Sequence, residues 1–444
     1  MTLEILAMNR FDPARAAAVD AETKALLDRR ARTFGPASVL FYERPVHMVS
    51  AEGVFMQAAD GTRYLDVYNN VPSVGHCHPK VVEAMARQAA VLNIHTRYLY
   101  DNVHTYAERL LAKLPESLAH LMLTCTGTES NDLALRLATN WTGGEGFVVT
   151  ETAYHGNSAA VTAISPSSMP GRTLPAHVRA IPAPDAYRRP TNDLSADFAA
   201  DLDRAIHELK TSGAGFAGFV ADSIFSSDGI YADPPGFMQD AIEVVHRHGG
   251  LFIADEVQPG FGRTGDGFWG FERHGVVPDI VTMGKPMGNG YPMGGVAVRA
   301  DVLQSFCDAV GYFNTFGGSP VAAAAGLAVL DAIEDEGLME NAKEVGTYLM
   351  GRLRDLARLR PSIGDVRGAG LFVGLEFVSE PEARTPDAAL ARRAINGLRD
   401  RGILIGAAGP FGNTLKIRPP LPFSRENADF FVDALDDFLA SEPA

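Results

Sequence analysis

The segment 251–290 reads LFIADEVQPGFGRTGDGFWGFERHGVVPDIVTMGKPMGNG and carries the clearest indication of both fold and chemistry. Its two short apolar runs, LFIAD and DIVTMG, have the length and composition typical of buried strands. Asp255 ends the first run, and Lys285 follows the second in a glycine-rich loop. Because α/β sheets bind ligands at the carboxyl ends of their strands, an acid and an amine at these positions predict a reactive site.

The same rhythm extends over much of the chain. Between about residues 61 and 325, apolar runs such as GFVVTE alternate with helical patterns such as FMQDAIEVVHRHG. This alternation predicts an α/β fold with a mostly parallel sheet flanked by helices. We expect a large domain at 61–325, a small α+β domain at 326–444, and an N-terminal segment at 1–60 that joins the small domain. A polar helix is expected at 14–32, and the proline-rich stretch 166–190 is expected to form a long loop.

Composition excludes several classes of protein. The formal net charge of -15 argues against nucleic acid as a partner, since phosphate backbones are bound by basic patches. No apolar stretch reaches membrane-spanning length, and the start has no basic leader before an apolar run, so we expect a cytoplasmic protein without a membrane partner. The three cysteines are too scattered for a disulfide framework, and the turn around His76 and His78 lacks the further ligands of a zinc site, so no metal is expected.

Lys285 differs from the six other lysines of the chain. Most of those read as solvated residues on helix faces or helix ends, and Lys416 falls in a C-terminal strand pattern. Only Lys285 follows a buried-type strand and enters a Gly-Asn-Gly loop, where a desolvated amine could hold an aldehyde cofactor as a Schiff base. Asp255 could hold the ring nitrogen of that cofactor protonated. Taken singly, Lys285 could instead be a surface lysine and Asp255 an ordinary turn cap.

Other residues fit the same cofactor, pyridoxal 5'-phosphate. Gly127 and Thr128 form a turn before a helical pattern, where the helix dipole and backbone amides favour a phosphate. Tyr154 and Val257 could pack on the two faces of the ring, and Gln258 could donate to its phenolic oxygen. Each feature alone has a plainer reading, as a helix cap or a core aromatic.

The chain resembles the class III aminotransferases, which are pyridoxal-phosphate enzymes of fold type I, from about residue 38 to 440. The resemblance rests on motifs along the whole length: YNNVPSVGHCHP (68–79), CTGTESND (125–132), YHG (154–156), IADEVQPGFGRTG (253–265), PDIVTMGKPMGNG (278–290), NTFGGSP (314–320), GDVRGAGLFVG (364–374) and KIRPPL (416–421).

The resemblance implies a large domain with a seven-stranded sheet and a role for each matched residue. Lys285 resembles the Schiff-base lysine, Asp255 the partner of the ring nitrogen, and Gln258 the donor to the phenolic oxygen. Tyr154 resembles the stacking aromatic, with Val257 beside the ring. Gly127 and Thr128 resemble the phosphate cradle. Thr315 resembles the threonine with which family members contact the cofactor phosphate of the neighbouring subunit. A homodimer with active sites at the subunit interface is therefore implied.

Three functions remain open on the sequence. The first is transfer of an amino group between a small amine or amino acid and a 2-oxo acid. The second is elimination of phosphate from an O-phosphorylated amine such as phosphoethanolamine. The motifs YNNV and LKIRPPL are similar to those of the ethanolamine-phosphate and phosphohydroxylysine phospho-lyases. The third is an inactive family member that acts as a binding module.

The candidate substrate-binding residues are Asn70, Arg97 and Arg418, although each arginine could equally form a structural ion pair. Asp222 occupies a cofactor-proximal position where relatives usually carry glutamate. In relatives that glutamate commonly neutralises or gates an arginine that binds the substrate carboxylate. The shorter side chain of Asp222 argues against this switch, and with it against assignment of a specific amino acceptor.

Overall fold

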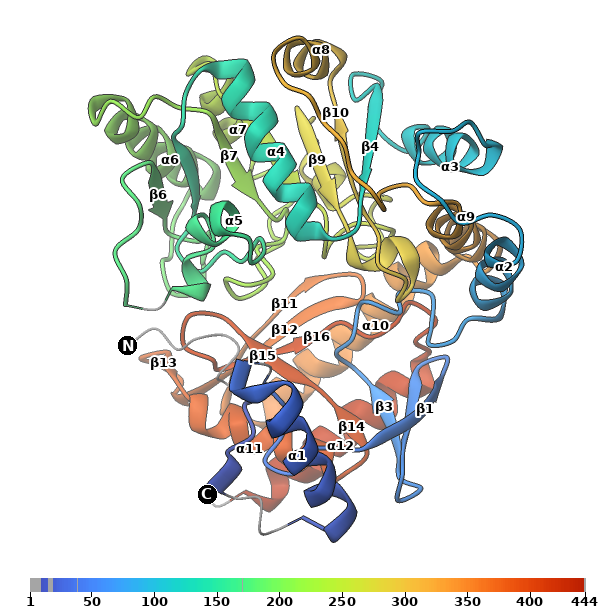
Figure 1. Ribbon diagram of the computed structural model, residues 1–444. Coiled ribbons are helices and arrows are strands. Elements are labelled where there is room, and N and C mark those ends of the chain that lie inside the picture. The colour runs from blue at the N-terminus through green and yellow to red at the C-terminus, as the bar shows by residue number, and fades with distance from the viewer. Residues whose placement is uncertain (1–8, 15–18, 38, 170, 443–444) are drawn as a thin grey trace.

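The computed structural model describes residues 9–14, 19–37, 39–169 and 171–442. Figure 1 shows two parts. The upper part in that view is built on a seven-stranded sheet, and the lower part combines N-terminal and C-terminal segments in two smaller sheets.

The large sheet has the strand order β4-β10-β9-β8-β7-β5-β6. Neighbouring strands pair in parallel, except that β10 runs antiparallel to both β4 and β9. The predicted α/β fold with a mostly parallel, seven-stranded sheet is therefore confirmed. The strands are β4 His120–Thr124, β5 Phe147–Thr150, β6 Val178–Ile181, β7 Gly218–Ala221, β8 Leu251–Asp255, β9 Ile280–Met283 and β10 Gly294–Val298.

Helices bury the central strands from both sides. Every residue of β5, β7, β8, β9 and β10 is buried, as expected for apolar strands with helices on both faces. Helix α4 packs against β9 and β10, α6 against β5 and β6, and α7 against β8. The helices of this part are α2 Pro79–Ala89, α3 Asp101–Leu111, α4 Gly127–Thr142, α5 Ala159–Ala163, α6 Leu194–Thr211, α7 Gln239–Arg247, α8 Ala300–Ala309 and α9 Pro320–Asp335.

The smaller part brings the two ends of the sequence together. One sheet has the order β1-β2-β3-β14, in which Leu65 of β3 pairs with Ile403 of β14. The other has the order β11-β12-β16-β15, with β13 paired to β12. The strands are β1 Met48–Glu52, β2 Phe55–Ala58, β3 Arg63–Asp66, β11 Ile363–Ala369, β12 Phe372–Glu380, β13 Thr385–Pro386, β14 Ile403–Leu404, β15 Gly406–Ala408 and β16 Thr414–Ile417; the helices are α10 Leu338–Leu359, α11 Ala388–Arg399 and α12 Arg425–Ser441.

Two local predictions differ from the structure. The proline-rich stretch 166–190 is not one long loop, because β6 lies within it and pairs in parallel with β5. The four residues of β6 contain no proline, so their backbone amides can pair in the sheet, where β6 is an edge strand. The N-terminal helix α1 spans Ala21–Thr33, starting at the side-chain cap Asp20, and residues 15–18 of the predicted helix lie outside the described residues.

No helix in the described ranges is both long and apolar enough to span a bilayer. The same ranges hold no group of three or more His, Cys, Asp or Glu side chains that is arranged to bind a metal ion.

Candidate active site

Lys285 and Asp255 lie together at the carboxyl edge of the large sheet. Asp255 is the last residue of β8, and Lys285 starts a short 3-10 turn just after β9. The two strands are parallel neighbours, with Asp255 opposite Thr282. A cavity of about 120 Å³ opens there, and its lining residues are Thr126, Gly127, Thr128, Tyr154, His155, Gly156, Asp222, Asp255, Val257, Gln258 and Lys285.

The amine of Lys285 is less basic than an ordinary lysine. Burial, followed by repulsion from the Arg418 charge, lowers the pKa of Lys285 to about 8, against the opposing attraction of Asp255 and Asp222. Near neutral pH a larger fraction of this side chain than of an ordinary lysine is therefore the free amine, which is the nucleophilic form.

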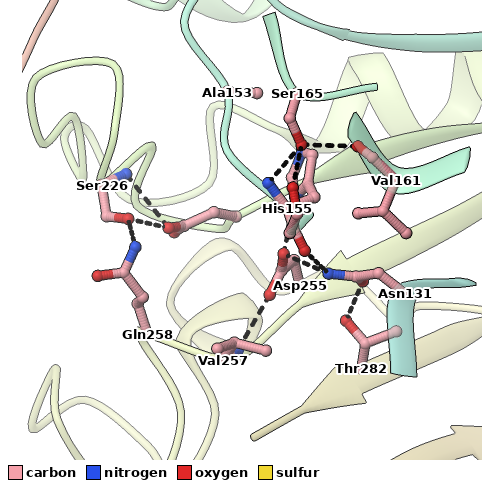
Figure 2. A network of polar contacts seen from close by, with 12 residues as sticks. Asn131, Ala153, His155, Val161, Ser165, Ser226, Asp255, Val257, Gln258 and Thr282 are labelled. Carbon is pink, nitrogen blue, oxygen red and sulfur yellow. Dashed lines mark hydrogen bonds and ion pairs between the residues drawn. The ribbon is translucent and has the colours of Figure 1, made fainter. Parts of the chain in front are cut away.

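Three donors hold the carboxylate of Asp255, as Figure 2 shows. Its Oδ2 is 2.7 Å from His155 Nδ1 and accepts from Asn131 Nδ2 at 3.0 Å, while Oδ1 accepts from the Val257 backbone amide at 3.1 Å. Thr282 Oγ1 donates to Asn131 Oδ1 at 2.7 Å, which orients the amide so that its nitrogen faces Asp255. These donors stabilise the negative charge that a cationic ring nitrogen would need opposite it.

Sequence reasoning missed His155 and Asn131 as parts of the site. Both stand inside motifs quoted for the resemblance, YHG and SND, so their positions were visible. Their contacts with Asp255 depend on how α4 and the loop after β5 pack on β8, which no local pattern reports.

The predicted phosphate cradle lies at the start of α4. Thr126 caps this helix, since its side chain accepts from the Glu129 amide at 3.1 Å. The loops pack so tightly that a Cβ on Gly127 would lie 2.9 Å from Val257 Cγ2, and one on Gly156 would lie 2.5 Å from Thr128 Oγ1. Only backbone fits at these positions, and Gly127 begins α4, so the N-terminus of a helix lines the cavity.

Tyr154 and Val257 lie on the cavity wall, as the expected ring-packing residues should. Val257 is buried, whereas the Tyr154 side chain remains 38% exposed. Tyr154 therefore has a free face that a flat ring can cover.

Gln258 and Asp222 belong to one polar chain that Figure 2 shows in part. Gln258 Nε2 donates to Ser226 Oγ at 2.6 Å, and Ser226 in turn donates to the Asp222 carboxylate. Burial raises the pKa of Asp222 to about 6, although the hydrogen bonds from Ser226 and the Ile224 amide oppose that rise. Ser226 was not predicted from the sequence.

Arg418 and Asn70, both predicted to bind substrate, lie against each other. Arg418 Nη1 donates to Asn70 Oδ1 at 2.9 Å and also to the Gln258 side-chain oxygen, which links the arginine to the cavity lining. The guanidinium stacks on the Tyr68 ring, 4.5 Å from its centroid. Among the described residues no carboxylate forms an ion pair with Arg418, so the structural ion-pair reading does not hold for it.

Lys416, two residues before Arg418 on β16, is a cation that sequence reasoning passed over. Only 6% of Lys416 is exposed, and no hydrogen bond or ion pair to its ammonium exists within the described part of the chain. Its recorded neighbour is the Phe372 ring, whose centroid is 5.5 Å away. A lysine in a C-terminal strand gives little local sign that tertiary packing will bury it.

Arg97 and Thr315 are not brought into the cavity. Arg97 stacks on Phe313, 3.8 Å from the ring centroid, and Thr315 lies in the loop between α8 and α9. Neither lines the cavity within this single chain.

Comparison with known proteins gives a consistent family. Residues 41–439 match the aminotransferase class-III family. An alanine–glyoxylate aminotransferase 2-like protein of Drosophila melanogaster is 41% identical, over 91% of this chain and 84% of its own length. An ethanolamine-phosphate phospho-lyase homologue of Caenorhabditis elegans is 39% identical over 96% of both chains.

Solved structures agree in fold. An Arthrobacter phospholyase in complex with phosphoethanolamine is 45% identical, with a TM-score of 0.91 over 94% of this chain and all of its own. An amine transaminase from an uncultivated Pseudomonas species, solved with pyridoxal phosphate bound, is 29% identical, with a TM-score of 0.82 over 90% of this chain and 95% of its own. With the match extending over nearly the whole chain, this protein belongs to the class III aminotransferases, a pyridoxal-phosphate-dependent enzyme family.

Proposed function

We propose that the cavity beside Lys285 holds pyridoxal 5'-phosphate. Lys285 offers a buried amine of lowered pKa for the aldehyde, and Asp255 offers a fixed carboxylate for the ring nitrogen. The N-terminus of α4, with no side chain at Gly127, offers backbone donors for the phosphate. When bound, the cofactor would supply a ring that stores the electrons released at the substrate's amine-bearing carbon.

We propose further that the enzyme is a phospho-lyase for an O-phosphorylated amine such as phosphoethanolamine. One observation carries this proposal: Lys416 and Arg418 are two buried basic side chains, and neither forms an ion pair with a carboxylate within the described residues. Buried charge without a directly paired counter-charge is unfavourable, so these two side chains favour an anionic ligand. A phosphate monoester, which carries close to two negative charges at neutral pH, would pair with Arg418 and favour the protonated form of Lys416.

Unsatisfied donors point to the same kind of ligand. Arg418 Nε and Asn70 Nδ2 are buried and have no hydrogen-bond partner among the described residues. Buried donors are normally paired, because an unpaired one costs about 1–3 kcal/mol. The oxygens of a phosphate ester could accept from both.

The residues divide the work of elimination between them. Lys285, displaced by the substrate amine, would take the proton from the amine-bearing carbon. Asp255 would hold the cofactor ring cationic, while Arg418 and Asn70 would hold the phosphate. Release of phosphate from the neighbouring carbon would then complete the reaction.

Amino transfer is the second candidate, and the Drosophila relative's name favours it. It needs the same Lys285 and Asp255, so those residues do not separate the two reactions. A substrate carboxylate, however, carries one negative charge and would compensate the pair of Lys416 and Arg418 less fully than a phosphate ester. The geometry thus favours phosphate elimination over the amino transfer that the sequence motifs placed first.

The deciding experiment offers each substrate to the purified holoenzyme. With phosphoethanolamine we expect free inorganic phosphate, and with pyruvate plus simple amines we expect little alanine. The Lys285→Ala variant should release no phosphate and serves as the control. Alanine formation without phosphate release would replace the phospho-lyase proposal with the transaminase.

An inactive binding module is the third candidate. The preserved pair of Lys285 and Asp255 argues against it, because a protein that has lost catalysis has no need for a nucleophilic amine beside a clamped carboxylate. A purified protein that stays colourless after incubation with pyridoxal phosphate would favour this module.

A further inference from the structure

Phosphate elimination requires a proton for the leaving group as well as a site that binds it. If a phosphate ester leaves as a fully ionised dianion, the departing oxygen takes the electron pair of the broken carbon–oxygen bond. The product would then be the phosphate trianion, which is a strong base. A proton must therefore reach that oxygen during cleavage, and a positioned acid is the usual source.

Two glycines lie opposite Lys416 in the neighbouring strands. Its partner in β12 is Gly374, and its partner in β15 is Gly406, so no cross-strand side chain flanks it. Neither glycine has room for a methyl group: a Cβ on Gly406 would lie 2.5 Å from the Tyr68 ring, and one on Gly374 would lie 3.1 Å from Ile230. The space beside Lys416 is therefore bounded by the Tyr68 ring and Ile230 rather than by side chains of the paired strand residues.

Lys416 lies in β16, and Arg418 follows the last strand residue, with its amide donating to the Val67 carbonyl at 2.9 Å. Side chains two residues apart in an extended chain point the same way, so we infer that both face the same side. Arg418 is held in place by Asn70 and Gln258, whereas the Lys416 ammonium has no recorded hydrogen-bond partner among the described residues. Gln258 also lines the cavity that contains Lys285. Lys416 itself does not line that cavity, but it lies close enough to interact electrostatically with Asp222 and Lys285, which do.

The two cations differ in what they can do chemically. A guanidinium does not give up its proton in proteins, so Arg418 can only bind. An ammonium can release one, and three influences make this easier here. Burial, the Arg418 charge and the Lys285 charge each lower the pKa of Lys416, while Asp222 and Asp228 oppose them.

We propose that Lys416 is the catalytic acid that protonates the departing phosphate. This proposal rests on the phospho-lyase function proposed above. Lys285 takes the proton from the amine-bearing carbon, and a double bond forms between that carbon and its neighbour. The bond from the neighbour to the ester oxygen breaks with its electron pair on oxygen, and Lys416 Nζ gives that oxygen a proton. The products are hydrogen phosphate, an unsaturated amine and a neutral Lys416, which regains its proton from water, while Lys285 carries the proton taken from carbon.

A matched pair of substrates tests this role. Phosphoethanolamine needs a proton on its leaving group, whereas 2-aminoethyl hydrogen sulfate does not, because sulfate is a very weak base. In Lys416→Arg, which keeps the charge but cannot act as the acid, we expect kcat for phosphate release to fall about 100-fold or more. The kcat for sulfate release should change little, and Lys24→Met, on the exposed face of α1, should leave both rates unchanged.

Binding is measured separately, without turnover. In the Lys285→Ala background, calorimetry should give phosphoethanolamine a similar affinity with and without the Lys416→Arg substitution, and a weaker one with Lys416→Met. Circular dichroism and the unfolding temperature verify that each variant is folded. If Lys416→Arg retains phosphate release, or loses phosphate and sulfate release equally, the acid role is overturned. If the wild-type enzyme releases no phosphate at all, the proposed function itself fails.

Discussion

At the scale of single residues, the lowered pKa of Lys285 has a measurable consequence. Below its pKa the side chain is an ammonium and does not attack an aldehyde; above it the amine is free. With a pKa of about 8, the rate of pyridoxal phosphate incorporation into apoenzyme should rise with pH and level off just above that value. Stopped-flow absorbance measures the rate. A rate that keeps rising to about pH 10, as for an ordinary lysine, would contradict the prediction.

His155 offers a second prediction at this scale. It lies next to Asp255 in the buried interior, and we expect its Nδ1 to act as a donor to the carboxylate. His155→Leu removes that donor and should reduce the free energy of unfolding by about 1–3 kcal/mol and weaken pyridoxal phosphate binding. His155→Asn places an amide N–H near the same point and should recover most of both losses. Urea unfolding and fluorescence titration measure them. Equal losses in the two variants would mean that the hydrogen bond is not the cause.

At the scale of elements, the packing of the loop after β5 on the start of α4 forms the proposed phosphate cradle. Gly156 has a φ of 146°, in the region that favours glycine, and a Cβ there would lie 2.5 Å from Thr128 Oγ1. Gly156→Ala should therefore cost about 1–3 kcal/mol of stability and lower the affinity for pyridoxal phosphate.

Gly351→Ala is the matched control for that substitution. Gly351 lies on the exposed side of α10, and a Cβ there would meet nothing within 4 Å. This variant should gain about 0.5–1 kcal/mol, because alanine favours the helix, and should bind the cofactor normally. If Gly156→Ala behaves like the control in both thermal unfolding and cofactor titration, the cradle does not depend on a bare backbone at this point.

At the scale of the whole molecule, exposed apolar side chains point to self-association. Leu99 is 93% exposed and Phe316 is 72% exposed. They lie in the segments 91–99 and 313–316, whose other exposed large apolar residues are Val91, Leu92, Tyr98 and Phe313. We propose that a second copy of the chain covers them, since apolar surface of this kind marks contact sites. A homodimer would also bring loop residues such as Thr315 near a partner's cavity.

Analytical ultracentrifugation tests this assembly. We expect a mass of twice 47.5 kDa for the wild type and a shift towards the monomer in Phe316→Asp. Leu359→Asp changes an exposed apolar residue at the end of α10 and should leave the mass unchanged. A wild-type monomer at micromolar concentration would contradict the proposal.

The sequence alone determined the fold class and the central residues of the candidate site. Parallel strands end at one edge of a sheet, so the ends of two apolar runs were enough to predict Asp255 and Lys285 as neighbours. The glycine turn before α4 was likewise visible as a local pattern. These features depend on strand direction and helix starts, which short stretches of sequence encode.

Only the tertiary structure decided which other groups reach that site. Lys416 lies on β16 and Arg418 just after it, far along the chain from Lys285. The roles proposed for them depend on packing that buries both and, among the described residues, pairs neither with a carboxylate. The donors to Asp255 depend on the packing of α4 and a loop against β8. Such contacts join residues that are distant in sequence. The pKa of a charged side chain depends on its burial and on neighbouring charges, and both are set only when the surrounding elements have packed.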